Sequence, residues 1–71
     1  MKLHYYPETD SLYIELKAEP SVDSQEIADN VVVDFGDDGS VVGIDIDQAS
    51  KKLDLESLEA VNFPKILTTH R

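Results

Sequence analysis

Cysteine is absent from the 71-residue chain. Its absence excludes disulfide bonds, thiolate nucleophiles and cysteine-ligated zinc sites, so the stability of the fold must come from packing. Long hydrophobic runs are absent too. The longest is Val31-Val32-Val33, whereas a membrane-spanning helix needs about 20 apolar residues. Because the first residues also lack the apolar core of a secretory signal, we expect a soluble, cytoplasmic protein.

Basic residues are scarce. Six Lys and Arg stand against fifteen Asp and Glu, which gives a formal charge of -9. This charge argues against a nucleic-acid backbone or an anionic membrane as partner and favours a basic protein. Residues 18–47 contain nine acidic side chains and no Lys or Arg, so the excess negative charge lies in this central stretch. Hydrophobic residues make up 41% of the chain, which is enough for a globular core.

The chain is also short. Its length allows one small domain, residues 1–71, and a domain of this size buries only about 60% of the surface that its unfolded chain exposes. Small domains gain stability when they associate with one another. We therefore expect a homo-oligomer.

Alternating apolar and polar residues predict a first β-hairpin over Lys2–Lys17. Its turn is placed at residues 7–10, where Pro7 suits the second position of a type I turn. This turn brings apolar residues opposite apolar residues and a lysine opposite a glutamate. The predicted pairs are Tyr5 with Leu12, Leu3 with Ile14, His4 with Tyr13 and Lys2 with Glu15.

A second hairpin is predicted over Val31–Asp47, where Asp38-Gly39 is typical of a type I′ turn. A two-residue loop and a four-residue loop give the same alternation of faces. A three-residue loop would place Phe35 opposite Val41, and it suits the apolar pattern only if a β-bulge intervenes. The favoured register pairs Phe35 with Val42, Val33 with Ile44 and Val31 with Ile46, and it leaves Asp34, Asp45 and Asp47 on the opposite face.

Further elements are expected around these hairpins. Ser24–Ala28 can form a short extra strand, and Asp54 is placed to cap a helix over Leu55–Val61, with Gln48–Lys52 as a turn or short helix before it. The predicted fold is α+β, an antiparallel sheet of two hairpins within residues 2–47 followed by a helical segment at 48–71. Because one face of this sheet is apolar, the helical segment or a second subunit must cover it.

Carboxylates dominate the second hairpin. They suit Ca²⁺ or Mg²⁺ as ligands, but the calcium-loop pattern has Gly36 where its second ligand belongs and ends on Asp45 in place of glutamate. The favoured hypothesis is an acidic surface for a basic protein, and aromatic side chains on the outer face of the sheet suit such a contact. The predicted partner-binding residues are Asp34, Asp37, Asp38, Asp45, Asp47, His4, Tyr6 and Tyr13.

Catalytic machinery is not expected. His4 and His70 are the histidines of the chain, and histidine is the side chain that ordinarily exchanges protons near neutral pH. Neither belongs to a recognisable metal or nucleophile motif, and the sequence has no Gly-x-Ser-x-Gly elbow and no glycine-rich phosphate loop. A hydrolase built on His4 or on a pair of aspartates is the remaining enzymatic hypothesis. We expect a protein without enzymatic activity and without a cofactor.

Several turn and strand motifs carry a family resemblance. They are Tyr6-Pro7-Glu8-Thr9-Asp10-Ser11-Leu12-Tyr13-Ile14, Val31-Val32-Val33-Asp34-Phe35, Asp38-Gly39, Val41-Val42-Gly43-Ile44-Asp45-Ile46 and Ala49-Ser50. With them the chain resembles the domain-of-unknown-function family 2283, a family of small bacterial and archaeal proteins, over about residues 2–53. The resemblance implies no catalytic residue. Since some members of that family are thought to partner small toxin-like proteins, it implies a binding module with an antitoxin-like role.

Overall fold

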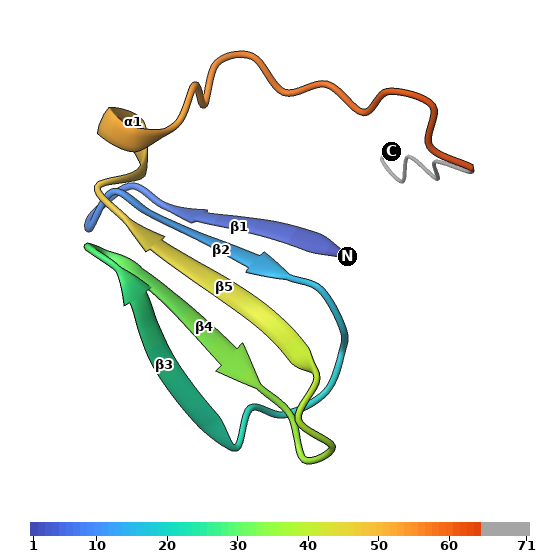
Figure 1. Cartoon of the computed structure of the whole chain (residues 1–71). Helices are drawn as coiled ribbons and strands as arrows, with labels where there is room; N and C mark the ends of the chain where they lie inside the picture. Colours follow the sequence, from blue (N-terminus) through green and yellow to red (C-terminus); the bar gives the residue numbers. More distant parts are fainter. Residues whose placement is uncertain (65–71) are drawn as a thin grey trace.

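The computed structural model describes residues 1–64, and its centre is one five-stranded antiparallel sheet (Figure 1). The strands lie side by side in the order β1-β2-β5-β4-β3. A short helix, α1, follows β5. The elements are β1 (Lys2–Tyr6), β2 (Ser11–Glu15), β3 (Asp23–Ala28), β4 (Val31–Phe35), β5 (Val41–Asp47) and α1 (Ala49–Lys52).

The sheet is continuous. It is therefore not the pair of hairpins that the sequence predicts, although the α+β class holds in outline. β2 and β5 pair along five residues, from Ser11 opposite Asp47 to Glu15 opposite Gly43, and this pairing joins the two hairpins. β3 adds a fifth strand beside β4. The two edges of the sheet are consequently β1 and β3.

The predicted register of the first hairpin is confirmed. Tyr5 lies opposite Leu12, Leu3 opposite Ile14, and Lys2 opposite Glu15. The turn closes with a hydrogen bond from the Thr9 N–H to the Tyr6 carbonyl, 3.3 Å long. Alternation alone sets this pairing, because a slip of one residue would move every apolar side chain to the other face.

The second hairpin follows the prediction over most of its length and departs from it at the loop. Val33 lies opposite Ile44 as expected, but Phe35 lies opposite Val41 in place of Val42, across a bulge. Val42 is the most deeply buried apolar residue of the sheet, 1% exposed, and its carbonyl accepts the N–H groups of two residues that follow β2. Because Val42 is bonded to the residues that follow β2, it does not lie opposite Phe35.

The turn of this hairpin is not type I′. Gly39 has a φ of 84°, but Asp38 is not among the residues of positive φ, whereas a type I′ turn needs positive φ at both central positions. The N–H of Gly39 donates to the carbonyl of Gly36 at 3.0 Å, and the N–H of Gly36 donates to that of Ser40 at 2.8 Å. The loop is therefore a longer turn that ends on one left-handed glycine.

The predicted extra strand is confirmed. It begins one residue earlier than expected, at Asp23, and pairs with β4. Asn30 adopts a φ of 64° in the tight turn between β3 and β4, a conformation that asparagine tolerates better than most residues. The register shifts between Glu26 and Ala28, so Ile27 forms a bulge in this edge strand.

The predicted helix at Leu55–Val61 is wrong. The helix of this region is α1 at Ala49–Lys52, and the chain after Leu53 has no regular structure up to residue 64. A helix of barely two turns has little stability of its own. Asp54 therefore does not act as a helix cap; its carbonyl accepts one N–H, from Ser57 at 3.3 Å. The rest of the predicted helical segment, residues 65–71, lies outside the described residues.

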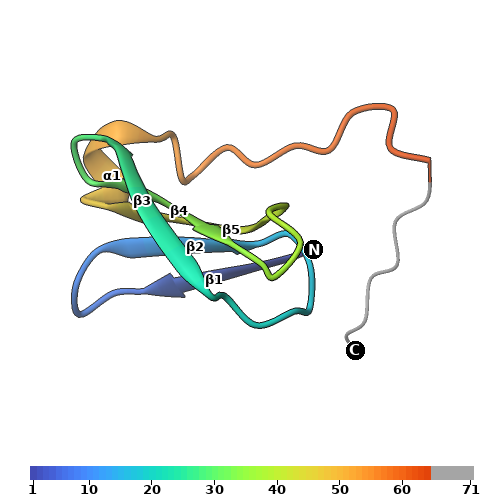
Figure 2. The same cartoon turned by 60° about the horizontal axis from the view of Figure 1, so that its bottom comes forward.

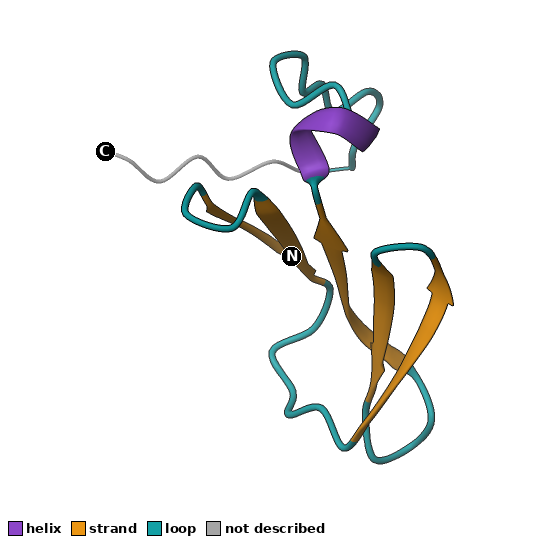
Figure 3. Cartoon of the chain, turned by 90° about the vertical axis from the view of Figure 1, so that its left-hand side faces the viewer, coloured by secondary structure: helices purple, strands orange, loops and turns teal. Residues whose placement is uncertain are grey.

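The two faces of the sheet differ in chemistry. Figure 3 shows α1 at one end of the sheet, directly beyond β5, and Figure 2 shows the following chain running along one side of it. That side carries the apolar side chains of the alternating pattern. The buried hydrophobic residues of the described chain are Val33, Val42, Ile46 and Ala49. Nowhere in residues 1–64 is a helix long and apolar enough to span a membrane.

Candidate functional site

The other side of the sheet, here called the polar face, carries most of the predicted site residues. Side chains on a strand alternate between faces, and opposite residues on neighbouring strands share a face. The observed register therefore arranges this face in three rows that cross the sheet. The rows are Lys2-Glu15-Gly43-Asp34-Ser24, His4-Tyr13-Asp45-Val32-Glu26 and Tyr6-Ser11-Asp47.

Tyr13 organises the centre of the polar face. Its ring extends from β2 over Gly43 on β5, and its hydroxyl donates to Oδ2 of Asp34 on β4 at 3.0 Å. Ser24 on β3 donates to the other oxygen of the same carboxylate at 2.7 Å. Burial raises the pKa of Tyr13, and the hydrogen bond to Asp34 raises it further. Side chains of three strands, β2, β4 and β3, are thereby linked on one face, across the glycine of β5.

Asp47 is held in a similar way. The hydroxyl of Ser11 donates to Oδ1 of Asp47 at 2.7 Å across the β2–β5 pair. Ser11 is itself buried and accepts the hydroxyl of Thr9 at 2.9 Å. The carboxylate of Asp47 remains exposed to solvent. A buried hydroxyl group therefore orients this exposed carboxylate.

Asp45 lies between Asp34 and Asp47, both along the chain and across the polar face. It is half-buried, and its Oδ1 atom is buried without a hydrogen-bond partner among residues 1–64. Burial raises the pKa of Asp45, and the neighbouring charges of Asp47 and Asp34 raise it further. The polar face thus contains one carboxylate whose negative charge is poorly compensated, and a cation placed beside it would relieve that strain.

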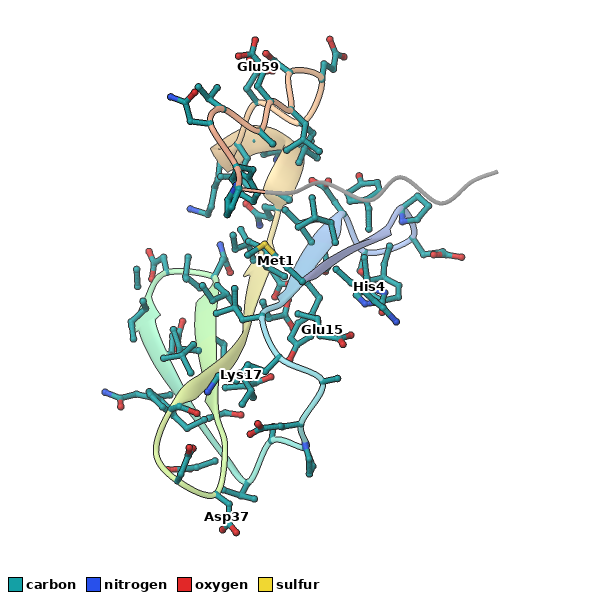
Figure 4. The ribbon with its side chains drawn as sticks, turned by 90° about the vertical axis from the view of Figure 1, so that its right-hand side faces the viewer. Met1, His4, Glu15, Lys17, Asp37 and Glu59 are labelled. Carbon is teal, nitrogen blue, oxygen red and sulfur yellow. The ribbon has the colours of Figure 1, made fainter. Side chains whose placement is uncertain are left out.

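His4 completes the outer part of the polar face at the β1 edge. Its Nε2 atom lies 3.1 Å from Oε1 of Glu15, on the neighbouring strand, and Figure 4 shows both side chains beside each other there. The imidazole ring lies 6.3 Å from the ring of Tyr13, tilted by 42°. His4 therefore lies between an aromatic ring and a carboxylate, and its hydrogen bond is to Glu15.

Six of the eight predicted partner-binding residues meet on the polar face. Asp37 and Asp38 do not, because they lie in the β4–β5 loop, at one end of the sheet (Figure 4). Asp38 accepts the N–H and the hydroxyl of Ser40, and these bonds lower its pKa. The six residues on the face are Asp34, Asp45, Asp47, His4, Tyr6 and Tyr13.

The carboxylates of the second hairpin do not form a metal-binding cluster. Within residues 1–64, no three acidic or histidine side chains converge on a point where an ion could be held. Both oxygens of Asp34 already accept hydroxyl groups of the protein. The residues that align with a calcium loop belong to a β-hairpin here, and the pleat spreads them along the sheet.

Other residues of the polar face did not emerge from the sequence. Ser11 and Ser24 fix two of the carboxylates, and Glu15 pairs with His4. The alternation that places Tyr13 outward places Ser11 and Glu15 outward too, so this signal was present in the chain. The contact of Ser24 with Asp34 depends on the pairing of β3 with β4, for which the local pattern carries no signal.

The opposite face contains an apolar groove of about 470 Å³. β1 and β2 form one wall, where Leu3 is 47% exposed and Tyr5 46%, and the chain after α1 forms the other. The groove was not predicted, because it depends on an irregular segment that was expected to be helical. Its lining residues are Leu3, Tyr5, Leu12, Leu53, Asp54, Leu55 and Leu58.

Asp10 fixes α1 against the first hairpin. One carboxylate oxygen accepts the hydroxyl of Tyr5 at 2.7 Å, and the other accepts the hydroxyl of Ser50 at 2.7 Å. The carbonyl of Asp10 also accepts the N–H of Ala49 at 2.9 Å. These contacts, first that from Tyr5 and then that from Ser50, lower the pKa of Asp10. The short helix is thereby held at the end of the groove.

The class of the chain is that of a small antiparallel β-sheet domain with one charged and one apolar face. Its residues 2–50 match the model of a known family, described as "Protein of unknown function (DUF2283)". The match spans most of the chain, so the chain belongs to this family, as the motifs of the sequence indicate. No curated protein and no solved structure matches the chain.

Proposed function

We propose that this chain is a non-enzymatic protein-interaction module that binds a small basic protein through its polar face, in the manner of an antitoxin. The observation that carries the proposal is the alignment of Asp34, Asp45 and Asp47 on β4 and β5, on the face opposite the groove. Arginine and lysine side chains of a partner would complement this surface.

Preorganisation supports this role. Asp34 is held by two hydroxyl groups and Asp47 by one, so these carboxylates lose little conformational freedom when a partner binds. The flanking Tyr6 is 49% exposed and offers apolar contact area beside the charges. Charged residues that are already oriented, together with an aromatic neighbour, are favourable features of a protein interface.

The crowding of negative charge around Asp45 supports a cationic partner in particular. Burial raises the pKa of Asp45, and the neighbouring charges of Asp47 and Asp34 raise it further. A guanidinium or ammonium group seated against the exposed carboxylate of Asp47 would lower the repulsion among these carboxylates. A basic partner would therefore stabilise the charged state of this face.

The hydroxyl groups near these carboxylates favour binding over catalysis. Ser11 and Ser24 donate to Asp47 and Asp34, whereas a serine nucleophile needs a neighbouring base such as histidine. Among the described residues, His4 makes its hydrogen bond with Glu15 and none with a serine or threonine. The serine hydroxyl groups therefore orient the carboxylates and have no base to activate them.

Affinity capture tests the proposal. The tagged full-length chain is incubated with lysate of its host at low and at high salt, and the captured proteins are identified by mass spectrometry. The test variant is Asp34→Asn/Asp45→Asn/Asp47→Asn. The control variant, Glu19→Gln/Asp29→Asn/Asp37→Asn, removes the same charge from exposed loops.

We expect the wild type and the control variant to capture the same basic protein in a salt-sensitive manner, and the test variant to lose it. Capture of no basic protein by the wild type, or equal capture by both variants, would contradict the proposed function.

A further inference from the structure

The edge strand β1 is the part of the sheet best suited to pair with another strand. All five of its residues pair with β2 in an unbroken register, so its backbone is regular along its length. It carries one formally charged residue, Lys2, and Pro7 lies beyond its end. A regular edge strand with a single charged residue at its start is a template for strand addition.

The opposite edge, β3, has the features that prevent such pairing. Its register is interrupted by the bulge at Ile27, and it carries the acidic residues Asp23 and Glu26. Bulges and like charges on an edge strand disfavour edge-to-edge association. Two copies of this chain would repel each other along β3, whereas β1 has no comparable protection.

The unused hydrogen-bonding groups of β1 can be assigned from the ladder. The N–H of Leu16, just after β2, donates to the carbonyl of Val42 on β5 at 2.8 Å, so the even-numbered residues of β2 face β5 and the odd-numbered ones face β1. β1 therefore bonds to β2 through its own even-numbered residues. The backbone N–H and C=O groups of Leu3 and Tyr5 point outward, to the open edge.

The side chains of these same two residues line the apolar groove, and about half of each is exposed. Free backbone groups and exposed apolar side chains thus occur together along one edge. An added strand would satisfy the backbone groups and would cover the apolar side chains at the same time. A single partner strand therefore removes two separate costs.

The distribution of charge favours β1 as the place where two copies of this chain meet. Each copy carries a net charge of -9, but residues 1–17 contain two lysines against three acids and are nearly neutral. The acidic residues 18–47 form the loops and strands on the side away from β1. Two copies that meet at β1 keep their acidic surfaces apart.

We propose that two copies of the chain associate through antiparallel pairing of β1 with β1, with Leu3 of each copy opposite Tyr5 of the other. The pairing joins the two sheets into one and closes the apolar groove of each copy against the other. It uses the edge and the apolar side of the sheet, so it does not depend on the function proposed for the polar face.

Sedimentation equilibrium of the full chain over a range of concentrations tests the dimer. We expect a mass that rises to twice 7.9 kDa. Leu3→Lys places a charge in the interface of each copy, so it should weaken the dimer at least ~10-fold, given the loss of a buried leucine side chain. Ile27→Lys is the matched control, since it alters an exposed apolar residue of the other edge strand, and it should leave the dimer intact.

Amide hydrogen exchange supplies a second test that needs no variant. The amides of Leu3 and Tyr5 should be protected in the wild type, and their protection should increase with protein concentration. A monomer at every concentration, or a dimer that Ile27→Lys disrupts and Leu3→Lys does not, would overturn the proposal. Protection of both amides in a monomer would also overturn it, because the edge would then be covered without a second copy.

Discussion

The hydroxyl of Tyr13 occupies the position where a side chain on Gly43 would stand, and from there it donates to Asp34 at 3.0 Å. Gly43 lies on β5, between the strand of Tyr13 and the strand of Asp34. The missing side chain therefore lets an aromatic ring cross a whole strand and reach a carboxylate beyond it. One glycine determines how the centre of the polar face is built.

Replacement of Gly43 by alanine should destabilise the protein. Alanine is ordinarily favoured over glycine in a strand by about 0.5–1 kcal/mol, but here its methyl group would collide with the Tyr13 ring. We expect a net loss of about 1–3 kcal/mol in the free energy of unfolding, typical of overpacking, measured by urea denaturation. In a Tyr13→Ala background the same substitution should be neutral or stabilising. A loss of equal size in both backgrounds would contradict the packing argument.

Local alternation was sufficient to predict much of the sheet. The pairing of Leu3 with Ile14 and of Val33 with Ile44 follows from the period of two and from the need to keep apolar residues on one face. The same parity placed Tyr13 on the outer face of the first hairpin and Asp34 on the outer face of the second. The sequence was sufficient to predict which side chains point outward, because alternation along each hairpin sets which of its residues lie on each face.

What the sequence did not reveal depends on contacts between distant segments. The pairing of β2 with β5 brings Tyr13 next to Gly43, and neither hairpin alone contains this information. The predicted helix at Leu55–Val61 had an apolar stripe, but Leu55 and Leu58 instead line the groove from an irregular chain. Tertiary contact outweighs helical propensity in a segment this short.

The contacts of Asp10 should make stability depend on pH at the acid end. Hydrogen bonds from Tyr5 and then from Ser50 lower the pKa of Asp10, so its contribution to stability is present above its unfolded pKa and is lost as the pH falls through the lowered value. Asp10→Asn tolerates the positive φ of this position. The variant should have a lower urea midpoint at neutral pH and a smaller further loss on acidification.

Glu8→Gln is the control for this prediction, because it removes the same charge from an exposed position of the same turn. Its midpoint should follow that of the wild type across the pH range. If the midpoints of Asp10→Asn and the wild type stay a constant distance apart down to acid pH, the carboxylate of Asp10 does not contribute in this way.

Addition of Ca²⁺ or Mg²⁺ should leave the protein unchanged. The carboxylate of Asp34 is occupied by the hydroxyl groups of Tyr13 and Ser24, and no three candidate ligands converge within residues 1–64. Isothermal titration with millimolar metal should therefore give no saturable heat, and the melting temperature should not rise. A saturable heat that Asp34→Asn abolishes would instead favour a divalent-cation site on the second hairpin.

Asp45 should destabilise the protein at neutral pH. Burial raises the pKa of its carboxyl group, as do the charges of Asp47 and Asp34, so the folded state binds this proton more tightly than the unfolded chain does. The stabilising effect of this proton is fully present below the unfolded pKa and is lost as the pH rises through the raised value. Asp45→Asn should therefore have a higher melting temperature than the wild type at neutral pH, and the difference should shrink on acidification. Asp37→Asn, which removes an equal charge from the exposed β4–β5 loop, should show a much smaller gain that varies little with pH. Equal gains in both variants would attribute the effect to net charge and not to the position of Asp45 on the polar face.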